Sequence, residues 1–259
     1  MKLRFLLLFF FCATMACVPG LAQTRQTQTI AHRGEWRSEG SAQNSRTSLQ
    51  RALDLHIFGS EIDIWMTRDG HIMVNHDATF KGVTVQDTTF AACKNVRLNN
   101  GERMPELKHL LKIMKKSKSP TRLIVEVKPH RDPVRSRACA TAAVEAIRKQ
   151  KLEERVMYIS FSIEACETIH ALAPDAEVAY LNGDRTPEEL HRMGLTGIDY
   201  HINRFKEHPE WVEKAHRLGM NVNVWTVDEP EDIRAMQALG VDYITTNEPS
   251  LCESIIRQP

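Results

Sequence analysis

The segment Gly59-Ser60-Glu61-Ile62-Asp63-Ile64 is typical of a buried strand that carries acidic groups on one side. Successive side chains of a strand point to opposite faces, so Glu61 and Asp63 share one face while Ile62 and Ile64 share the other. Two isoleucines on one face indicate that this face packs against helices. The carboxylates then point into the interior or mouth of a barrel, where uncompensated charges are costly.

Strand and helix patterns alternate on either side of this segment along almost the whole chain. About eight strands are expected, each followed by a helix, and the hairpin turn Arg68-Asp69-Gly70 is an addition to the second strand. Alternation of this kind over roughly 240 residues favours an α/β fold of the TIM (β/α)8 barrel type over an open doubly wound sheet. No glycine-rich phosphate loop follows the first strand, which counts against a dinucleotide-binding fold. The expected strands span 29–32, 60–64, 123–127, 156–160, 177–181, 197–201, 221–225 and 242–245.

Residues 1–22 are typical of an export signal rather than of the folded domain. A short basic start precedes an apolar run over Leu6–Met15, and Gly20-Leu21-Ala22 offers small residues at a cleavage site. The run is shorter than the ~20 apolar residues of a transmembrane anchor, and the residues before Cys17 fit a lipidation box poorly. We therefore expect a cleaved signal peptide and an exported protein, periplasmic or secreted, with one domain over 23–259.

The composition shows no bulk electrostatic preference for polyanions. The formal net charge is +1 over 259 residues, so attraction to nucleic acid or to anionic lipid is not expected. The short apolar run at the N-terminus likewise predicts no stable membrane insertion. Four cysteines remain after export, and no pair has the spacing of a zinc site or a redox dithiol. A polar segment over about 78–105 interrupts the alternation after the second strand. This insertion either shapes a substrate pocket or decorates the surface.

Acidic side chains are expected to meet at the carboxyl ends of the barrel strands, because these ends converge on one face. Glu126 and Lys128 come from the third strand and share one of its faces. Glu61, Asp63 and Glu126 would repel one another unless a cation lies between them. Ligation by oxygen atoms alone favours Mg²⁺ or Ca²⁺ over zinc. The alternative is a salt-bridge network with Arg33 and Lys128, which explains any one pair better than it explains the whole set.

Two histidines near strand ends are candidates for proton transfer. His32 ends the first strand beside Arg33, and His76 follows the second strand at a hairpin's distance, beside Asp77. A single histidine at a strand end is more often structural than catalytic. Two histidines that flank a metal, with Arg33 and Lys128 available for phosphate oxygens, would form a general acid and base with an electrostatic clamp.

These residues also resemble a known family in their order and spacing. The matching stretch runs from about Ile30 to Pro249, nearly the whole mature chain. Its motifs are His32-Arg33-Gly34, Glu61-x-Asp63, His76-Asp77, Glu126-x-Lys128, Trp225-Thr226 and Thr246-Asn247-x-Pro249. In this order they are similar to the motifs of the glycerophosphodiester phosphodiesterase family. The resemblance implies a TIM barrel that hydrolyses glycerophosphodiesters to glycerol 3-phosphate and an alcohol.

The resemblance also implies a role for each candidate site residue. Three acids would ligate a divalent metal, two histidines would transfer protons, and three further residues would contact the substrate or its phosphate. The resemblance then implies a small-molecule diester as the binding partner. It also favours a role in substrate recognition for the insertion over 78–105. Which histidine is the acid and which the base stays open. The assignments are Glu61, Asp63 and Glu126 for the metal, His32 and His76 for proton transfer, and Arg33, Lys128 and Trp225 for the substrate.

Two positions depart from the family's usual pattern. Gln43, in the stretch Ala42-Gln43-Asn44-Ser45, stands where a glutamate is usual, and Asn247 replaces a usual aspartate. An amide still accepts hydrogen bonds but adds no negative charge. Activity is still expected, although the substrate need not be the ordinary one.

Two other functions stay open at the level of sequence. The same barrel and metal could serve a phospholipase-D-like hydrolase of lipid headgroups, but the sequence shows no strongly apolar or basic exposed segment that could meet a membrane. A non-catalytic phosphodiester-binding protein is the other alternative, since Gln43 and Asn247 are changes that a decaying site would show. The intact pair of histidines argues against that alternative.

Overall fold

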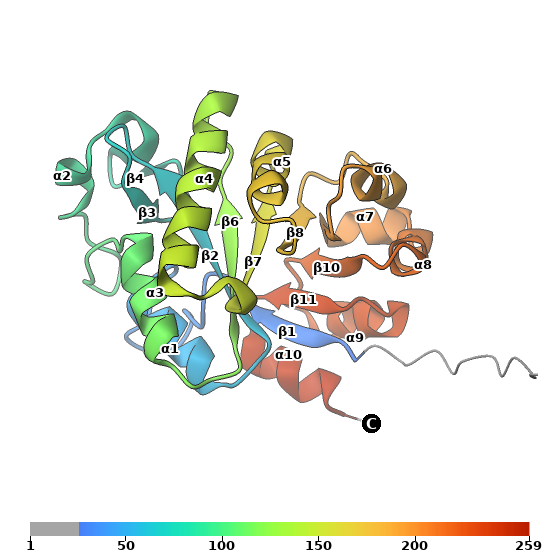
Figure 1. Cartoon of the computed structure of the whole chain (residues 1–259). Coiled ribbons are helices and arrows are strands. Elements are labelled where there is room, and N and C mark those ends of the chain that lie inside the picture. Colours follow the sequence, from blue (N-terminus) through green and yellow to red (C-terminus); the bar gives the residue numbers. More distant parts are fainter. Residues whose placement is uncertain (1–25, 259) are drawn as a thin grey trace, which may run out of the picture.

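The computed structural model describes residues 26–258, and these form a closed barrel of parallel strands with helices around it (Figure 1). The strands follow one another in the order β1-β11-β10-β9-β8-β7-β6-β2, and pairing between β1 and β2 closes the ring. The predicted TIM (β/α)8 barrel is thereby confirmed. Its strands are β1 (Gln28–Ala31), β2 (Gly59–Met66), β6 (Arg122–Val127), β7 (Val156–Ser160), β8 (Glu177–Tyr180), β9 (Gly197–His201), β10 (Asn221–Trp225) and β11 (Tyr243–Thr246).

Helices cover the outside of this ring, and local sequence signals set their ends. At the start of the first helix, the Ser48 backbone N–H donates to the Ser45 hydroxyl at 2.9 Å, and the Ser45 N–H donates to the Ser48 hydroxyl at 3.1 Å. Gly240 ends another helix in a left-handed conformation with φ of 86°. The helices are α1 (Arg46–Asp54), α3 (Leu107–Lys116), α4 (Pro133–Gln150), α5 (Ile163–Leu172), α6 (Pro187–Arg192), α7 (Ile202–Glu207), α8 (Glu210–Arg217), α9 (Pro230–Leu239) and α10 (Pro249–Ile256), with a short 3-10 turn η2 (Glu153–Arg155) before β7.

Apolar side chains form two layers on either side of the strands. The larger layer lies between strands and helices and includes Ile62 and Ile64 of β2. A smaller cluster inside the barrel includes Ile30, Ile124 and Met157. The outward isoleucines leave Glu61 and Asp63 on the inner face of β2, as the alternation in the sequence predicts.

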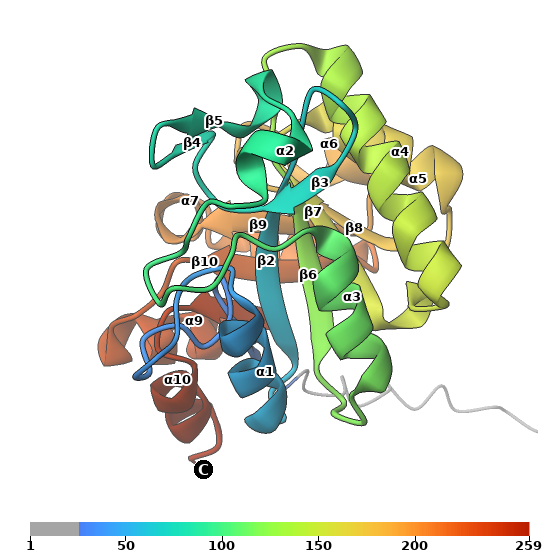
Figure 2. The same cartoon turned by 90° about the vertical axis from the view of Figure 1, so that its left-hand side faces the viewer.

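The segment after β2 forms a lobe at the carboxyl end of that strand (Figure 2). Its first strand, β3 (Ile72–Val74), pairs antiparallel with the end of β2. This pairing extends β2 to Met66, so the acids lie within the strand rather than at its end, where the sequence placed them. The lobe has its own apolar cluster, which includes Trp65, Met73, Val85 and Cys93. Its further elements are β4 (Thr79–Phe80), β5 (Val83–Thr84), η1 (Val85–Asp87) and α2 (Phe90–Cys93).

Three further features of the sequence are the N-terminal segment, the membrane-spanning potential and the cysteines. The signal peptide predicted over 1–22 lies outside the described residues. Among the described residues, no helix is both long enough and apolar enough to cross a bilayer. The cysteines of the described part of the chain are free and buried: Cys93, Cys139, Cys166 and Cys252.

Candidate active site

Three carboxylates from β2 and β6 meet inside the barrel. The parallel pairing of these strands sets Asp63 opposite Glu126, and Glu61 lies on the same face of β2 as Asp63. Oxygen atoms of all three side chains lie within 4.8 Å of one another, and all three residues are buried. The structure therefore brings together the three acids that the sequence singled out as metal ligands.

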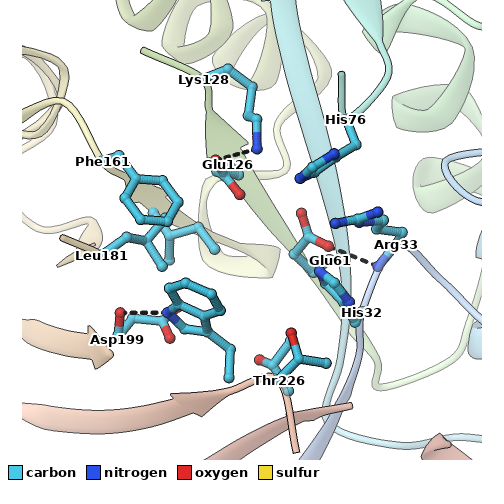
Figure 3. Close-up of a pocket in the computed structure, with 13 residues that line it drawn as sticks. His32, Arg33, Glu61, His76, Glu126, Lys128, Phe161, Leu181, Asp199 and Thr226 are labelled. Atoms are coloured by element: carbon cyan, nitrogen blue, oxygen red, sulfur yellow. Dashed lines mark hydrogen bonds and ion pairs between the residues drawn. The ribbon is translucent and has the colours of Figure 1, made fainter. Parts of the chain in front are cut away.

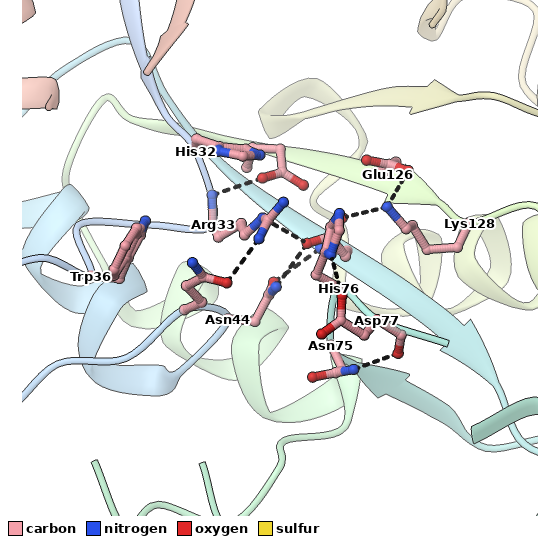
Figure 4. A network of polar contacts seen from close by, with 12 residues as sticks. His32, Arg33, Trp36, Asn44, Asn75, His76, Asp77, Glu126 and Lys128 are labelled. Atoms are coloured by element: carbon pink, nitrogen blue, oxygen red, sulfur yellow. Dashed lines mark hydrogen bonds and ion pairs between the residues drawn. The ribbon is translucent and has the colours of Figure 1, made fainter. Parts of the chain in front are cut away.

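Two cations lie against this acidic cluster, as Figure 4 shows. Lys128 Nζ lies 3.1 Å from Asp63 Oδ1 and 2.8 Å from Glu126 Oε1. The backbone N–H of Arg33 donates to Glu61 Oε2 at 2.7 Å, and Arg33 Nε lies 3.8 Å from Asp63 Oδ2. The salt-bridge network that is the alternative to a metal site is thus present. It has two cationic side chains for three carboxylates, so it cannot neutralise the whole cluster.

One carboxylate oxygen of the cluster has no partner, and two others share a single ammonium group. Glu61 Oε1 is buried and accepts no hydrogen bond from the described residues, whereas Asp63 Oδ1 and Glu126 Oε1 lie 3.1 and 2.8 Å from Lys128 Nζ. A buried carboxylate oxygen without a partner is costly. Oxygen donors at this spacing fit a hard divalent cation, so the cluster could hold a metal ion.

Burial and mutual repulsion push the pKa values of the three acids apart. Burial, then Asp63, then Glu126 raise the pKa of Glu61 well above its ordinary value. Burial and then Asp63 raise the pKa of Glu126 to about 8. Burial acts in the same direction on Asp63, but opposing charges, Lys128 foremost, hold its pKa below the ordinary value. Asp63 is therefore the charged member of the metal-free cluster, and a bound cation would favour the charged form of all three.

A tight turn after β1 brings His32 and Arg33 to the cluster. Arg33 and Gly34 both adopt left-handed backbone conformations, with φ of 60° and 78°. A Cβ atom at Gly34 would lie 2.7 Å from the backbone carbon of Ser48 in α1, so only glycine fits this position. The glycine of the predicted His-Arg-Gly motif thus lets α1 pack closely under the site.

His32 is mostly buried, and its hydrogen bonds define its tautomer. Its Nδ1 lies 2.9 Å from Asn247 Oδ1, which also accepts from Trp36 Nε1 at 3.1 Å. The Asn247 amide nitrogen donates to Asp228 Oδ2 at 2.8 Å. These contacts fix which end of the amide is the oxygen and which is the nitrogen. His32 therefore carries its proton on Nδ1 and turns the Nε2 lone pair to the pocket. Burial, and then Arg33, lower the pKa of His32 to about 4, which keeps the ring neutral at pH 7.

The same contacts give a reason for asparagine at position 247. A carboxylate in place of the Asn247 amide would face Asp228 Oδ2 across 2.8 Å, and two carboxylates at that distance repel. The other departure, Gln43, accepts a hydrogen bond from Arg33 Nη1 at 2.8 Å. It therefore positions the Arg33 guanidinium without neutralising it.

His76 is the second imidazole of the site, and it has a carboxylate partner. Its Nδ1 lies 2.7 Å from Asp77 Oδ1. Burial lowers the pKa of His76, and Asp63 acts in the opposite direction. Figure 3 shows the imidazoles of His32 and His76 on either side of Glu61. Both predicted proton-transfer residues therefore lie beside the acidic cluster.

A pocket of about 270 Å³ lies at the carboxyl end of the barrel, and six of these residues form one of its walls: His32, Arg33, Glu61, His76, Glu126 and Lys128. The opposite wall is mainly apolar and comes from the ends of β7 to β10 (Figure 3). Phe161 packs edge-on against Trp225 with the ring centroids 5.6 Å apart, and Leu181 lies beside them. Trp225, predicted as a substrate contact, thus lines the pocket, and its Nε1 donates to the Asp199 carbonyl at 3.0 Å.

Sequence reasoning did not single out three residues of the site. Phe161 and Leu181 follow strands and carry no motif. Asp199 lies on the inner face of β9, and its Oδ1 accepts no hydrogen bond from the described residues. Burial raises the pKa of Asp199 to about 7. The sequence did contain a signal for this position. Asp199 lies between Ile198 and Tyr200, and when two large apolar neighbours face the helices, the acid between them faces the barrel interior.

Comparison with known proteins places the chain in one family. The model of the glycerophosphoryl diester phosphodiesterase family matches residues 32–251. The chain belongs to this family. The resemblance drawn from the motifs is therefore confirmed, and the chain is an enzyme of the phosphoric diester hydrolase class.

Relatives of the family match along almost their whole length. A glycerophosphodiester phosphodiesterase from Caldanaerobacter subterraneus is 28% identical over 246 residues, covering 90% of this chain and 99% of that protein. The crystal structure of a glycerophosphodiester phosphodiesterase from Parabacteroides distasonis is 44% identical, with a TM-score of 0.88 over 90% of this chain and 98% of that one. A phosphodiesterase from Oleispira antarctica, in complex with the product sn-glycerol-3-phosphate, shares the fold at 22% identity and a TM-score of 0.77, covering 90% of this chain and 98% of its own.

Proposed function

We propose that this enzyme hydrolyses glycerophosphodiesters to glycerol 3-phosphate and an alcohol, with a divalent metal held by Glu61, Asp63 and Glu126. The observation that carries the proposal is the buried cluster of three acids, in which Glu61 Oε1 has no partner among the described residues, flanked by imidazoles and cations. Its donors are all oxygen atoms, which favours Mg²⁺ or Ca²⁺. The metal would supply Lewis-acid stabilisation of the charge on the phosphate. The product bound in the Oleispira antarctica relative is consistent with this reaction.

The two cations beside the cluster would bind and orient the phosphate. Lys128 and Arg33 both line the pocket. Gln43 holds Arg33 through a neutral amide, so the guanidinium keeps its charge for phosphate oxygens. The apolar wall around Phe161 and Trp225 would exclude water from the far side of the diester, which strengthens these interactions.

His32 would act as the base and His76 as the acid. The free Nε2 of His32 can take the proton of the attacking hydroxyl, which belongs to water or to the glycerol 2-hydroxyl. The oxygen of that hydroxyl bonds to phosphorus while the bond from phosphorus to the alcohol oxygen breaks. If the glycerol 2-hydroxyl attacks, the product of this step is a cyclic phosphate, and water must then open the ring in a second step to give glycerol 3-phosphate. His76 gives its proton to the departing oxygen. Asp77, 2.7 Å from His76 Nδ1, stabilises the imidazolium that such a donor needs.

Alanine substitution of either histidine tests these roles. Loss of a catalytic acid or base typically lowers the rate by about 10²–10⁴-fold, and we expect His32→Ala and His76→Ala to show a fall of that size in kcat. His191→Ala, at an exposed position in α6, is the matched control and should retain full activity. Full activity in either pocket variant would overturn the assignment.

A chelator and a substrate panel test the metal and the substrate class. Activity on glycerophosphodiesters should vanish with the chelator and return with added Mg²⁺ or Ca²⁺. Sphingomyelin and lysolipids should be poor substrates, and a preference for them would favour the phospholipase-D-like alternative. Tight binding of a glycerophosphodiester without turnover under any metal would favour the non-catalytic alternative.

We also propose that the protein is exported after removal of residues 1–22. The basic, apolar and small-residue order of that segment supports this location. The mature protein should begin at Gln23 and be recovered from the periplasmic or extracellular fraction. An intact N-terminus in the cytoplasmic fraction would contradict export.

A further inference from the structure

A second cavity lies next to the active-site pocket, between the loop that follows β1 and the lobe that follows β2. Its volume is about 460 Å³. His76 lines both this cavity and the active-site pocket, so the imidazole stands in the wall between them. Figure 4 shows Trp36, His76 and Asp77, all of which line the second cavity.

The position of His76 determines what this cavity can receive. In the proposed reaction His76 gives its proton to the departing alcohol oxygen, which must therefore lie within hydrogen-bond distance of this imidazole. With the phosphate held by the cations of the first pocket, the rest of the alcohol extends past His76. The second cavity lies on that side.

Neutral hydrogen-bonding groups dominate the walls of the second cavity. Ser38 and Ser41 donate to the Glu35 carbonyl at 3.4 and 2.9 Å, which leaves their acceptor lone pairs for a ligand. The Gln43 amide nitrogen and the whole Asn99 side-chain amide have no hydrogen-bond partner in the described part of the chain. Donors and acceptors are therefore both available.

Each aromatic ring of the cavity has one of the protein's own cations beside it. The Arg37 guanidinium, which also pairs with Asp228 and Glu248, lies 5.3 Å from the centroid of the Trp36 ring, and Lys81 Nζ lies 5.4 Å from the centroid of the Phe80 ring. An ammonium group at the Phe80 ring would therefore meet the positive charge of Lys81. The one acidic side chain of the lining, Asp77, is paired with His76.

We propose that the second cavity binds the alcohol moiety of the diester, and that the preferred alcohol is neutral and polyhydroxylated, such as glycerol or inositol. This inference rests on the proposed hydrolysis of glycerophosphodiesters and adds the class of leaving alcohol. Hydroxyl groups match the serine and amide side chains, and a neutral ligand meets no repulsion from Lys81. Choline and ethanolamine, which are cationic, match neither feature.

Relative kcat/KM values of the wild-type enzyme give the first test. Glycerophosphoglycerol and glycerophosphoinositol should be hydrolysed with a kcat/KM at least about fivefold above that for glycerophosphocholine, since two or more hydrogen bonds distinguish them. Equal values, or a preference for choline, would overturn the inference and leave the proposed function intact. Failure to hydrolyse any glycerophosphodiester with any metal would overturn both.

Variants of the cavity wall give the second test. Asn99→Leu should lower kcat/KM for the polyol diesters by about three- to tenfold and lower the value for glycerophosphocholine by clearly less. Asn95→Leu makes the same chemical change in the same lobe at an exposed position outside the cavity lining, so it should change neither value. Equal losses on both substrates in Asn99→Leu would contradict an alcohol subsite.

A gain of activity provides a readout that a folding defect cannot imitate. Lys81→Asn removes the cation from the Phe80 ring and keeps a residue that tolerates the left-handed backbone at this position, where φ is 49°. The kcat/KM for glycerophosphocholine should rise about two- to fivefold and that for glycerophosphoglycerol should not. No rise for the choline substrate would refute the role assigned to the Phe80 ring.

Discussion

The two halves of the active-site pocket differ in how their buried acids are compensated. The half formed by β1, β2 and β6 gathers three acids, and Lys128 and Arg33 lie against them. The half formed by β7 to β10 is apolar apart from Asp199, whose pKa responds to burial and to a hydrogen bond with Asn223. In the first half opposite charges keep Asp63 ionised, and a bound metal would favour the charged forms of Glu61 and Glu126 as well. In the second half the solitary Asp199 is half protonated near neutral pH. The reacting phosphate belongs on the first side.

Removal of the cation from the charged half should have the largest effect. Lys128→Met leaves Asp63 and Glu126 without their shared counter-ion. In the presence of a chelator, we expect the free energy of unfolding to fall by about 3–5 kcal/mol, the usual cost of breaking a buried ion pair. Added Mg²⁺ or Ca²⁺ should restore part of it, because a ligand of the folded state stabilises that state. Urea denaturation with and without metal measures both effects.

A matched substitution on the surface separates this effect from the loss of any lysine. Lys116 is exposed at the end of α3, and Lys116→Met should leave the free energy of unfolding within about 0.5 kcal/mol of the wild type. If Lys128→Met were as stable as Lys116→Met in the chelator, the charged half would not depend on its counter-ion.

Removal of the acid from the apolar half should have a comparable but pH-dependent effect. Because burial raises the pKa of Asp199 to about 7, the folded state holds this proton more tightly than the unfolded state. The stabilisation is therefore complete below pH 4 and is lost as the pH rises to 7. It is on the order of 4 kcal/mol. Asp199→Asn should remove this dependence, so the wild type loses stability relative to the variant between pH 4 and 7.

Denaturant titrations at several pH values measure this difference. Asp175→Asn, at an exposed position, is the control and should follow the wild-type curve. Parallel curves for the wild type and Asp199→Asn would mean that Asp199 stays ionised, so that the apolar half contains a compensating charge.

The barrel could be predicted from sequence because its signal is repeated along the chain. Alternating strands and helices recur so often that single errors do not change the fold, and the predicted spans of β7, β9 and β10 coincide with those observed. The predicted end of β2 was wrong because the true end depends on pairing with β3. The residue pattern of a single strand does not show which strand it pairs with.

The charged half of the site could also be predicted, but the apolar half could not. Glu61 and Asp63 are two residues apart on one face of β2, and Asp63 lies opposite Glu126 on the adjacent strand β6, so the alternation and the chain order already imply that the three acids meet. Asp199 is a lone acid in an apolar strand, and such acids are common without any function. The tautomer of His32 depends on Asn247, which is 215 positions away, and spacing in the sequence holds no information about that contact.

The smallest expected effect tests whether the orientation of the Asn247 amide fixes the tautomer of His32, the proposed base of the charged half. Asp228 Oδ2 accepts from the Asn247 amide nitrogen and so turns Asn247 Oδ1 toward His32 and Trp36. In Asp228→Asn an amide nitrogen can replace that acceptor, and the Asn247 amide then has no fixed orientation. We expect kcat/KM to fall by about tenfold, the equivalent of one hydrogen bond, while the fold is retained. Nitrogen NMR of His32 should show loss of the single Nδ1–H tautomer. Asp232→Asn, whose carboxylate pairs with Lys206 on the surface, should change neither, and an unchanged tautomer in Asp228→Asn would show that Asn247 needs no such support.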